Sequence, residues 1–237
     1  MHSFSFAPIG IIESPFRERF GIPRQPGLAP TAQGRLRLLP PYDNPACVEG
    51  LEQVSHLWVQ FVFHATAAAG WQPRVRPPRL GGNRRLGVFA SRSNFRPNPI
   101  GLSVVRLDRL DYSGQRASLL ISGLDLLNDT PVLDIKPYVP YVDAVEGARN
   151  GIAAQAPAKA LRIGFSPEAL AQLARLEAGA QLQRLIGEIL SLDPRPAYRQ
   201  GESGREHATR LMGQDVRWRM LTPDQAEVFE IRPDGPA

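Results

Sequence analysis

Short apolar segments that are repeatedly interrupted by proline and glycine constrain the fold of this chain more than any other feature. The 237 residues include 23 prolines and 21 glycines. No apolar stretch approaches the roughly 20 residues that a membrane-spanning helix needs. Because proline and glycine interrupt regular helices and favour turns, the chain predicts short strands joined by turns and ordered loops, rather than a helical bundle.

Several segments in the first half of the chain have the residue content of strands. Alternation of apolar and polar residues predicts a strand at 34–39, and β-branched and aromatic residues predict a buried one at 56–64. The other candidates are 9–12, 85–90, 101–107 and 117–122. Turn residues at 111–114 join the last two as a hairpin. Strands at this density predict a mainly β fold, either a small closed barrel or a sandwich.

The pattern changes near residue 145. Residues 146–160 are small, polar and irregular, as is typical of a linker. Ser166 is the predicted N-cap of a helix, because Pro167 follows at the first helical position. Gly179 is expected to interrupt the helical pattern, and a second apolar stripe follows before the proline-rich segment 193–196 ends it.

The end of the chain predicts two strands, 216–221 and 226–231, around a turn at 222–224. The predicted organisation is therefore a barrel domain at 1–145, a linker at 146–160 and a small α+β appendage at 161–237.

Charge is distributed unevenly along the chain. The formal net charge is +5, and residues 53–107 contain no Asp or Glu. The arginines of that stretch are Arg74, Arg76, Arg79, Arg84, Arg85, Arg92, Arg96 and Arg106. An arginine-rich genome would explain why arginine is preferred to lysine, but it would not explain the missing acids. The cluster favours a phosphate-binding surface and contact with nucleic acid.

Other classes of protein find little support. The single cysteine, Cys47, excludes an intrachain disulfide, and the N-terminus lacks the pattern of a signal peptide, so we expect a cytoplasmic protein. Glycine-rich nucleotide motifs and metal-ligand clusters are absent from the sequence, which argues against a Rossmann site and a metal centre. His56 and His64, predicted on one strand face, would lie roughly 26 Å apart, too far to share a metal.

Three segments combine residues that suit a binding site. Residues 75–101 combine arginines with stiffening prolines, and 23–27 lie in a long loop that could cover a ligand. Residues 123–138 place an acid, a base and a phenol just after a short strand. Each has a simpler interpretation: turns for the first two and a surface ion pair for the third.

Together these segments resemble the TrmO family, whose first domain is also called TsaA-like. The resemblance rests on PRQPGL at 23–28, SHLW and FVFH within 55–64, RPPRLGGN at 76–83, GVFA and FRPNPIG within 87–101, GLDLLNDTPVLDIKPY at 123–138, and DPRPAYR at 193–199. One departure is Asn128–Asp129, which stands where Asp-Gly is common in the family.

The resemblance implies a fold and a function. The first domain would be a small, closed, non-Rossmann β-barrel that binds S-adenosylmethionine, and the protein would be a homodimer. The substrate would be tRNA that carries N6-threonylcarbamoyladenosine beside the anticodon, and the product would be its N6-methyl derivative. The appendage would bind the tRNA anticodon stem-loop or complete the active site.

The resemblance also implies site residues. The cofactor pocket would consist of Gln25, Pro26, Gly27, Phe63, His64, Arg92, Leu102, Leu124, Asp134, Lys136 and Pro137. By chemical type, the candidates for a catalytic base are Asp134, Lys136, Tyr138 and Tyr198. The expected tRNA contacts are Arg74, Arg76, Arg84, Arg85, Arg96, Arg195 and Arg199.

Two alternative functions remain open. One is an RNA-binding module without catalysis, and the other is an S-adenosylmethionine-dependent enzyme that acts on a different substrate. A metal hydrolase is a distant further alternative, because ligands for a metal are lacking.

Overall fold

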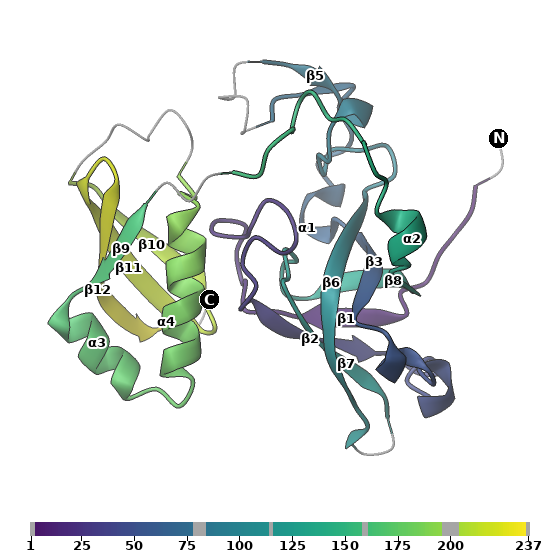
Figure 1. Cartoon of the computed structure of the whole chain (residues 1–237), viewed down its shortest axis with the longest axis horizontal. Helices are drawn as coiled ribbons and strands as arrows, with labels where there is room; N and C mark the ends of the chain where they lie inside the picture. Colours follow the sequence, from purple (N-terminus) through teal and green to yellow (C-terminus); the bar gives the residue numbers. More distant parts are fainter. Residues whose placement is uncertain (1–2, 78–83, 114–115, 158–160, 196–203, 236–237) are drawn as a thin grey trace.

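The first region of the chain is a closed barrel, as seen in a computed structural model that describes residues 3–77, 84–113, 116–157, 161–195 and 204–235 (Figure 1). Its strands are β1 (Gly10–Glu13), β2 (Gln33–Leu38), β3 (His56–Val62), β6 (Ile100–Asp111), β7 (Ser118–Ser122) and β8 (Thr130–Pro137). They pair in the order β1-β2-β7-β6-β3-β8, and every pair is antiparallel. The closed barrel, and not the sandwich, is therefore the correct one of the two predicted architectures.

Alternation along the strands fills the barrel. In β3, Leu57, Val59 and Phe61 are buried, whereas the residues between them face outward. Successive side chains of a strand point to opposite faces, so one apolar set forms the core and the other residues form the outer surface.

Short elements lie between the barrel strands or directly after the last one. They are η1 (Pro45–Cys47), η2 (Leu51–Gln53), α1 (His64–Ala67), β4 (Arg74–Val75), β5 (Leu86–Gly87), η4 (Val88–Ala90) and α2 (Pro140–Asp143). The strand predicted at 85–90 is mostly wrong, because only two of its residues form β5 and the three that follow form η4. His64 begins α1 and does not continue β3.

The second region is a sheet covered by two helices. Its elements are β9 (Arg162–Phe165), α3 (Pro167–Ala174), α4 (Gly179–Ser191), β10 (Glu206–Leu211), β11 (Gln214–Thr222) and β12 (Gln225–Pro233). The sheet order is β10-β11-β12-β9, so the predicted two-strand ribbon is incomplete. The missing strands, β9 and β10, are short and interrupted by glycine or polar residues, which hides them from a pattern based on apolar alternation.

The helix signals are confirmed. The Ser166 hydroxyl accepts a hydrogen bond from the Ala169 N–H, and Pro167 begins α3 as predicted. The interruption at Gly179 falls between the helices, where this residue begins α4. Among the described residues, no helix is both long and apolar enough to cross a membrane.

Candidate active site

The loop that carries Gln25 is fixed to the barrel by a backbone contact. The Gly27 N–H donates to the Gly123 carbonyl at 2.9 Å. Gly123 has φ 73°, and a Cβ added there would lie 3.5 Å from the Gly27 Cα. Glycine suits this position because the backbone is left-handed and the two chains approach closely. The segment 23–28, called here the Gln25 loop, therefore lies beside the start of the 123–138 motif.

A side-chain contact joins the Gln25 loop to a third motif. Arg92 Nη1 donates to Gln25 Oε1 at 2.7 Å, and the Arg92 side chain is otherwise exposed. Residues that are 67 positions apart in the chain thus meet at one end of the barrel. This contact brings together two of the predicted cofactor residues.

Asp125 is a member of this site that was not among the residues predicted from the sequence. Its Oδ1 accepts a hydrogen bond from Ser103 Oγ at 2.7 Å. Burial raises the pKa of Asp125 to about 6, although the Ser103 hydrogen bond and the nearby charge of Arg92 act in the opposite direction. A single acid in the apolar run of residues 119–127 was the available signal, because acids are rarely buried without a purpose.

The segment 91–99 and α1 form the adjoining wall. Asn94 Nδ2 donates to Thr66 Oγ1 at 2.9 Å, and the Phe63 N–H donates to the Pro99 carbonyl at 2.7 Å. Within the described part of the chain, the buried Nδ1 atom of His64 has no hydrogen-bond partner. A buried polar atom without a partner is costly, so His64 Nδ1 is suited to a hydrogen bond with a ligand.

The two leucines among the predicted cofactor contacts differ in exposure. Leu102, at the start of β6, keeps 48% of its surface exposed, whereas Leu124 is fully buried in the barrel core. The Leu124 side chain therefore stabilises the barrel, and it cannot cover the face of a ligand in this conformation.

Asp134 and Lys136, two of the predicted catalytic residues, lie on the outer face of β8, and Tyr138 follows its last residue. Asp134 and Lys136 form an ion pair at 2.7 Å inside the strand, and not after a strand as expected. Tyr138 contacts Trp58, with ring centroids 5.9 Å apart. Gln60 of β3 is paired with Leu102 on one side and with Asp134 on the other. In the described contacts, nothing joins this group directly to Gln25 or Arg92.

Comparison with known proteins identifies the family. Residues 11–144 match the tRNA-methyltransferase O N-terminal domain, and residues 158–234 match the TrmO C-terminal domain. The chain belongs to the TrmO family.

Relatives match the chain over nearly its full length. The Escherichia coli tRNA (adenine(37)-N6)-methyltransferase is 49% identical over 235 residues, which are 98% of this chain and 100% of that protein. A Pseudomonas aeruginosa protein, whose name proposes S-adenosylmethionine-dependent methyltransferase activity, is 51% identical over 96% of this chain and 97% of its own. The crystal structure of TrmO from Pseudomonas aeruginosa is 45% identical, with a TM-score of 0.81, and covers 98% of this chain and 99% of that one.

The departure from the TrmO pattern at Asn128–Asp129 is accommodated locally. Asp129 has φ 62°, in the left-handed region where aspartate is among the better tolerated residues after glycine. Asn128 Oδ1 accepts a hydrogen bond from the Ser14 N–H at 2.9 Å, and the Asp129 N–H donates to the Ile12 carbonyl at 2.8 Å. These bonds fix the turn that directly precedes β8.

Exposed arginines of this TrmO-family chain surround β4 and β5. Arg74, Arg76, Arg84 and Arg85 are exposed, and no ion pair involves them in the ranges that the structure describes. Arg96 differs, because its Nη1 donates to the Ser91 carbonyl at 2.7 Å and so holds its own loop. Four of the predicted tRNA contacts are thus available at the surface, and Arg96 has a second role.

The prediction for Arg195 is wrong. Its side chain is 1% exposed and forms a two-pronged ion pair with Asp193, at 2.8 Å and 2.9 Å. A buried guanidinium that is already paired cannot contact a phosphate at the surface. Tyr198 and Arg199 of the same motif lie outside the described residues. Among the described residues, no group of three or more His, Cys, Asp or Glu side chains could hold a metal ion.

Proposed function

We propose that this protein transfers a methyl group from S-adenosylmethionine to N6 of threonylcarbamoyladenosine in tRNA, at the adenine for which the Escherichia coli relative is named. Members of the family are S-adenosylmethionine-dependent tRNA methyltransferases, and relatives with these names support the coarser function. The observation that carries the proposal is the meeting of Gln25, Arg92 and Asp125 at one end of the barrel.

The residues at this end fit the chemistry of S-adenosylmethionine. Its carboxylate suits the guanidinium of Arg92, and its cationic groups suit the half-buried carboxylate of Asp125. His64 Nδ1 offers a hydrogen bond, and the exposed Leu102 offers an apolar contact to the adenine. We therefore propose that these residues, with the Gln25 loop, hold the cofactor.

Positioning accounts for much of the expected rate enhancement. When bound, S-adenosylmethionine supplies a methyl group that is already activated by its sulfonium. The protein must align N6 with that methyl group and exclude water from the site. Asp134, Lys136 and Tyr138 remain candidates for removing the N6 proton. The place of Asp134 and Lys136 on the outer face of β8, with Tyr138 just after the strand, would let them act on a base that approaches from outside the barrel.

Oligomeric state and organisation belong to the same proposal. We propose a cytoplasmic homodimer with a barrel domain at 1–145, a linker at 146–160 and a second domain at 161–237. Exposed apolar side chains beside the site support a covered surface, since Phe89 is 76% exposed, Ile100 39% and Leu102 48%. Light scattering coupled to gel filtration tests the dimer, and a monomeric mass at micromolar concentration would contradict it.

Methyl transfer from labelled S-adenosylmethionine to two tRNA pools, one with and one without the threonylcarbamoyl group, tests the function. We expect label only in the modified pool, and nucleoside mass spectrometry would place it on N6. Label in both pools would mean that the methyl group goes elsewhere on tRNA. Failure of both methyl transfer and cofactor binding would favour a non-catalytic RNA-binding protein.

A further inference from the structure

The chain on either side of the Gln25 loop is held by the C-terminal region. Before the loop, Phe16 forms an isolated antiparallel bridge with Leu211 of β10, and the Met212 N–H donates to the Pro15 carbonyl at 3.0 Å. Phe16 is fully buried in this contact. The chain that leaves β1 thus covers the edge of β10 that would otherwise present unpaired backbone groups.

The base of the Gln25 loop touches the C-terminal region closely. Gly21 has φ 86°, and a Cβ added there would lie 2.6 Å from Thr209 Cγ2 and 3.6 Å from Ile189 Cγ2. A small cavity of about 60 Å³ separates the loop from the end of α4. Its lining includes Pro23 and Arg24 of the loop and Asp193 of the buried ion pair. The base of the loop therefore packs against β10 and α4.

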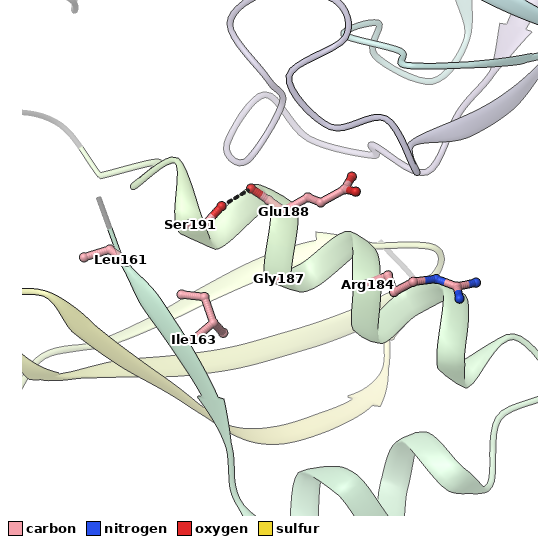
Figure 2. Close-up of a pocket in the computed structure, with 6 residues that line it drawn as sticks. All are labelled: Leu161, Ile163, Arg184, Gly187, Glu188 and Ser191. Atoms are coloured by element: carbon pink, nitrogen blue, oxygen red, sulfur yellow. Dashed lines mark hydrogen bonds between the residues drawn. The ribbon is translucent and has the colours of Figure 1, made fainter. Parts of the chain in front are cut away.

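After the loop, one carboxylate connects α4 to the barrel. Glu188 Oε2 accepts hydrogen bonds from the Thr31 N–H at 3.0 Å and from the Thr31 hydroxyl at 2.7 Å. Figure 2 shows the Glu188 side chain leaving α4 on the side of the barrel loops, at the margin of a groove that Arg184 and Gly187 also line. Ser191 donates to the Glu188 carbonyl at 2.8 Å, which fixes the last turn of the helix.

We infer that the C-terminal region braces the cofactor loop, with Glu188 as a positioning residue for S-adenosylmethionine binding. The inference rests on the proposed function, because it takes Gln25 to be part of the cofactor site. Glu188 is attached at Thr31, a few residues after Gln25, and the Phe16 contact holds the chain before it. The two attachments fix both ends of a loop whose own backbone contact, among the residues that the structure describes, is the bond to Gly123.

A brace and a tRNA-binding surface predict different results. If the C-terminal region only binds tRNA, then loosening Glu188 changes tRNA binding and leaves the affinity for the cofactor unchanged. If the C-terminal region braces the loop, then loosening Glu188 lowers the affinity for the cofactor even without tRNA, because cofactor binding must then order the loop. The coupling is reciprocal: if contact with the C-terminal region favours cofactor binding, then bound cofactor favours that contact. Cofactor should therefore protect the Met212 amide, which is bonded to Pro15, from hydrogen exchange.

The test measures S-adenosylmethionine binding to the full chain by calorimetry, without tRNA. Glu188→Leu removes both acceptor interactions, and Thr31→Val removes the hydroxyl donor from the other side. Glu188→Gln is the conservative variant, because its amide oxygen can still accept from Thr31. Glu177→Gln is the matched control, an exposed glutamate of the same region.

We expect the Kd for S-adenosylmethionine to rise about tenfold in Glu188→Leu and several-fold in Thr31→Val, on the scale of lost charge-assisted hydrogen bonds. Glu188→Gln and Glu177→Gln should stay near the parent value. In turnover, the KM for the cofactor should rise while kcat at saturating cofactor stays unchanged. Unchanged affinity in both Glu188→Leu and Thr31→Val would overturn the brace.

A second readout separates this inference from the proposed function. Hydrogen exchange of the Gly27 amide, which is bonded to Gly123, reports the order of the loop without any cofactor. Faster exchange in Glu188→Leu than in Glu177→Gln is expected. If the parent protein failed to bind S-adenosylmethionine, the proposed cofactor site would be wrong, and equal exchange rates in the two variants would then reject the brace on their own.

Discussion

Charged side chains have different surroundings in the two regions of the molecule. Around the barrel end, the four exposed arginines near β4 and β5 have no ion pair in the described part of the chain, and neither has the half-buried Asp125. On the C-terminal sheet, Arg219 faces Glu227 across the strands at 2.8 Å, and Arg232 meets Asp215 at 3.1 Å. Further paired arginines of that region are Arg162, Arg210 and Arg217.

The difference shows that the number of arginines is a poor guide to nucleic-acid contact. An arginine opposite an acid on the neighbouring strand is already neutralised, and such pairs mainly stabilise the sheet. An unpaired arginine can neutralise a phosphate and release its counterions. We therefore expect the barrel end to work on ligands, and the open face of the C-terminal sheet to contribute mostly to stability.

The largest expected effect concerns the unpaired acid. Because its folded-state pKa is about 6 against an ordinary 3.8, the contribution of Asp125 to stability is present below about pH 4 and is lost as pH rises through 6. Asp125→Asn should therefore be more stable than the parent at pH 8, by on the order of 3 kcal/mol. Urea unfolding of both proteins from pH 4 to 8 measures the difference.

Titratable groups that the parent protein and Asp125→Asn share cancel in the difference between their free energies of unfolding. We expect the gap in the free energy of unfolding to be small at pH 4 and to open between pH 4 and 6. A gap that does not change with pH would show that Asp125 titrates normally. The same variant should bind S-adenosylmethionine more weakly, since the cationic groups of the cofactor lose their carboxylate.

The next effect concerns the unpaired arginines. Arg84→Ala combined with Arg85→Ala should weaken tRNA binding about tenfold or more at 0.1 M salt. It should lower the slope of log K against log salt by about 2, one unit for each lost phosphate contact. Binding titrations at several salt concentrations measure both quantities. An unchanged slope would remove these two residues from the interface.

The paired arginines provide the matched control. Arg217→Ala combined with Arg219→Ala removes the same charge from the open face of the C-terminal sheet. We expect tRNA affinity to change by less than twofold per residue and the free energy of unfolding to fall by about 1 kcal/mol or less, as for surface ion pairs. A loss of tRNA affinity as large as that expected for the Arg84 and Arg85 substitutions would contradict the proposed difference between the two regions.

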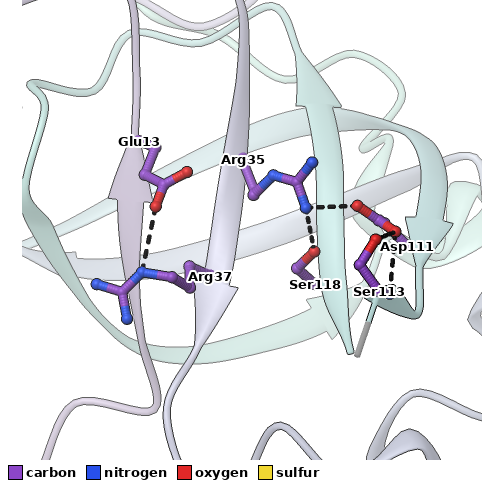
Figure 3. A network of polar contacts seen from close by, with 6 residues as sticks. All are labelled: Glu13, Arg35, Arg37, Asp111, Ser113 and Ser118. Carbon is purple, nitrogen blue, oxygen red and sulfur yellow. Dashed lines mark hydrogen bonds and ion pairs between the residues drawn. The ribbon is translucent and has the colours of Figure 1, made fainter. Parts of the chain in front are cut away.

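The smallest expected effect is on a paired acid of the barrel itself. Figure 3 shows Asp111 accepting hydrogen bonds from Ser113 and Arg35, beside the separate Glu13–Arg37 pair. The hydrogen bonds from Ser113 and then that from Arg35 lower the pKa of Asp111 to about 2. Its stabilisation should therefore be present above pH 4 and be lost as pH falls toward 2.

Asp111→Asn should destabilise the protein slightly at neutral pH and leave tRNA binding unchanged. Thermal unfolding at pH 7 and pH 3 checks this, because the difference between parent and variant should shrink at the lower pH. An equal difference at both values would mean that the charge of Asp111 contributes nothing.

Local signals predicted the parts of the fold that depend on local chemistry. The Ser166 cap, the strand at β3 and the hairpin pairing of β6 with β7 are each set by neighbouring residues, and each is confirmed. The outward position of Asp134 within β8 depends on which strands pair, and a short motif does not contain that information. Burial of Arg195 likewise depends on Asp193 and on packing at the end of α4.

The candidate site was predicted in part. The family motifs named Gln25 and Arg92, and the structure brings these two into contact. Asp125 was missed because a single acid between leucines does not show that Ser103 lies beside it in the folded chain. The attachment of Glu188 to Thr31 spans 157 residues, and no sequence pattern relates positions so far apart.

Hydrogen exchange of the full chain with and without a threonylcarbamoylated anticodon stem-loop, in saturating S-adenosylmethionine, tests the central contrast most directly. Bound RNA should slow exchange at 74–76 and 84–88 and leave β11 and β12 unchanged, because the unpaired arginines lie at the first two segments. Protection confined to β11 and β12, with none near β4 and β5, would contradict the assignment of the RNA surface to the barrel end.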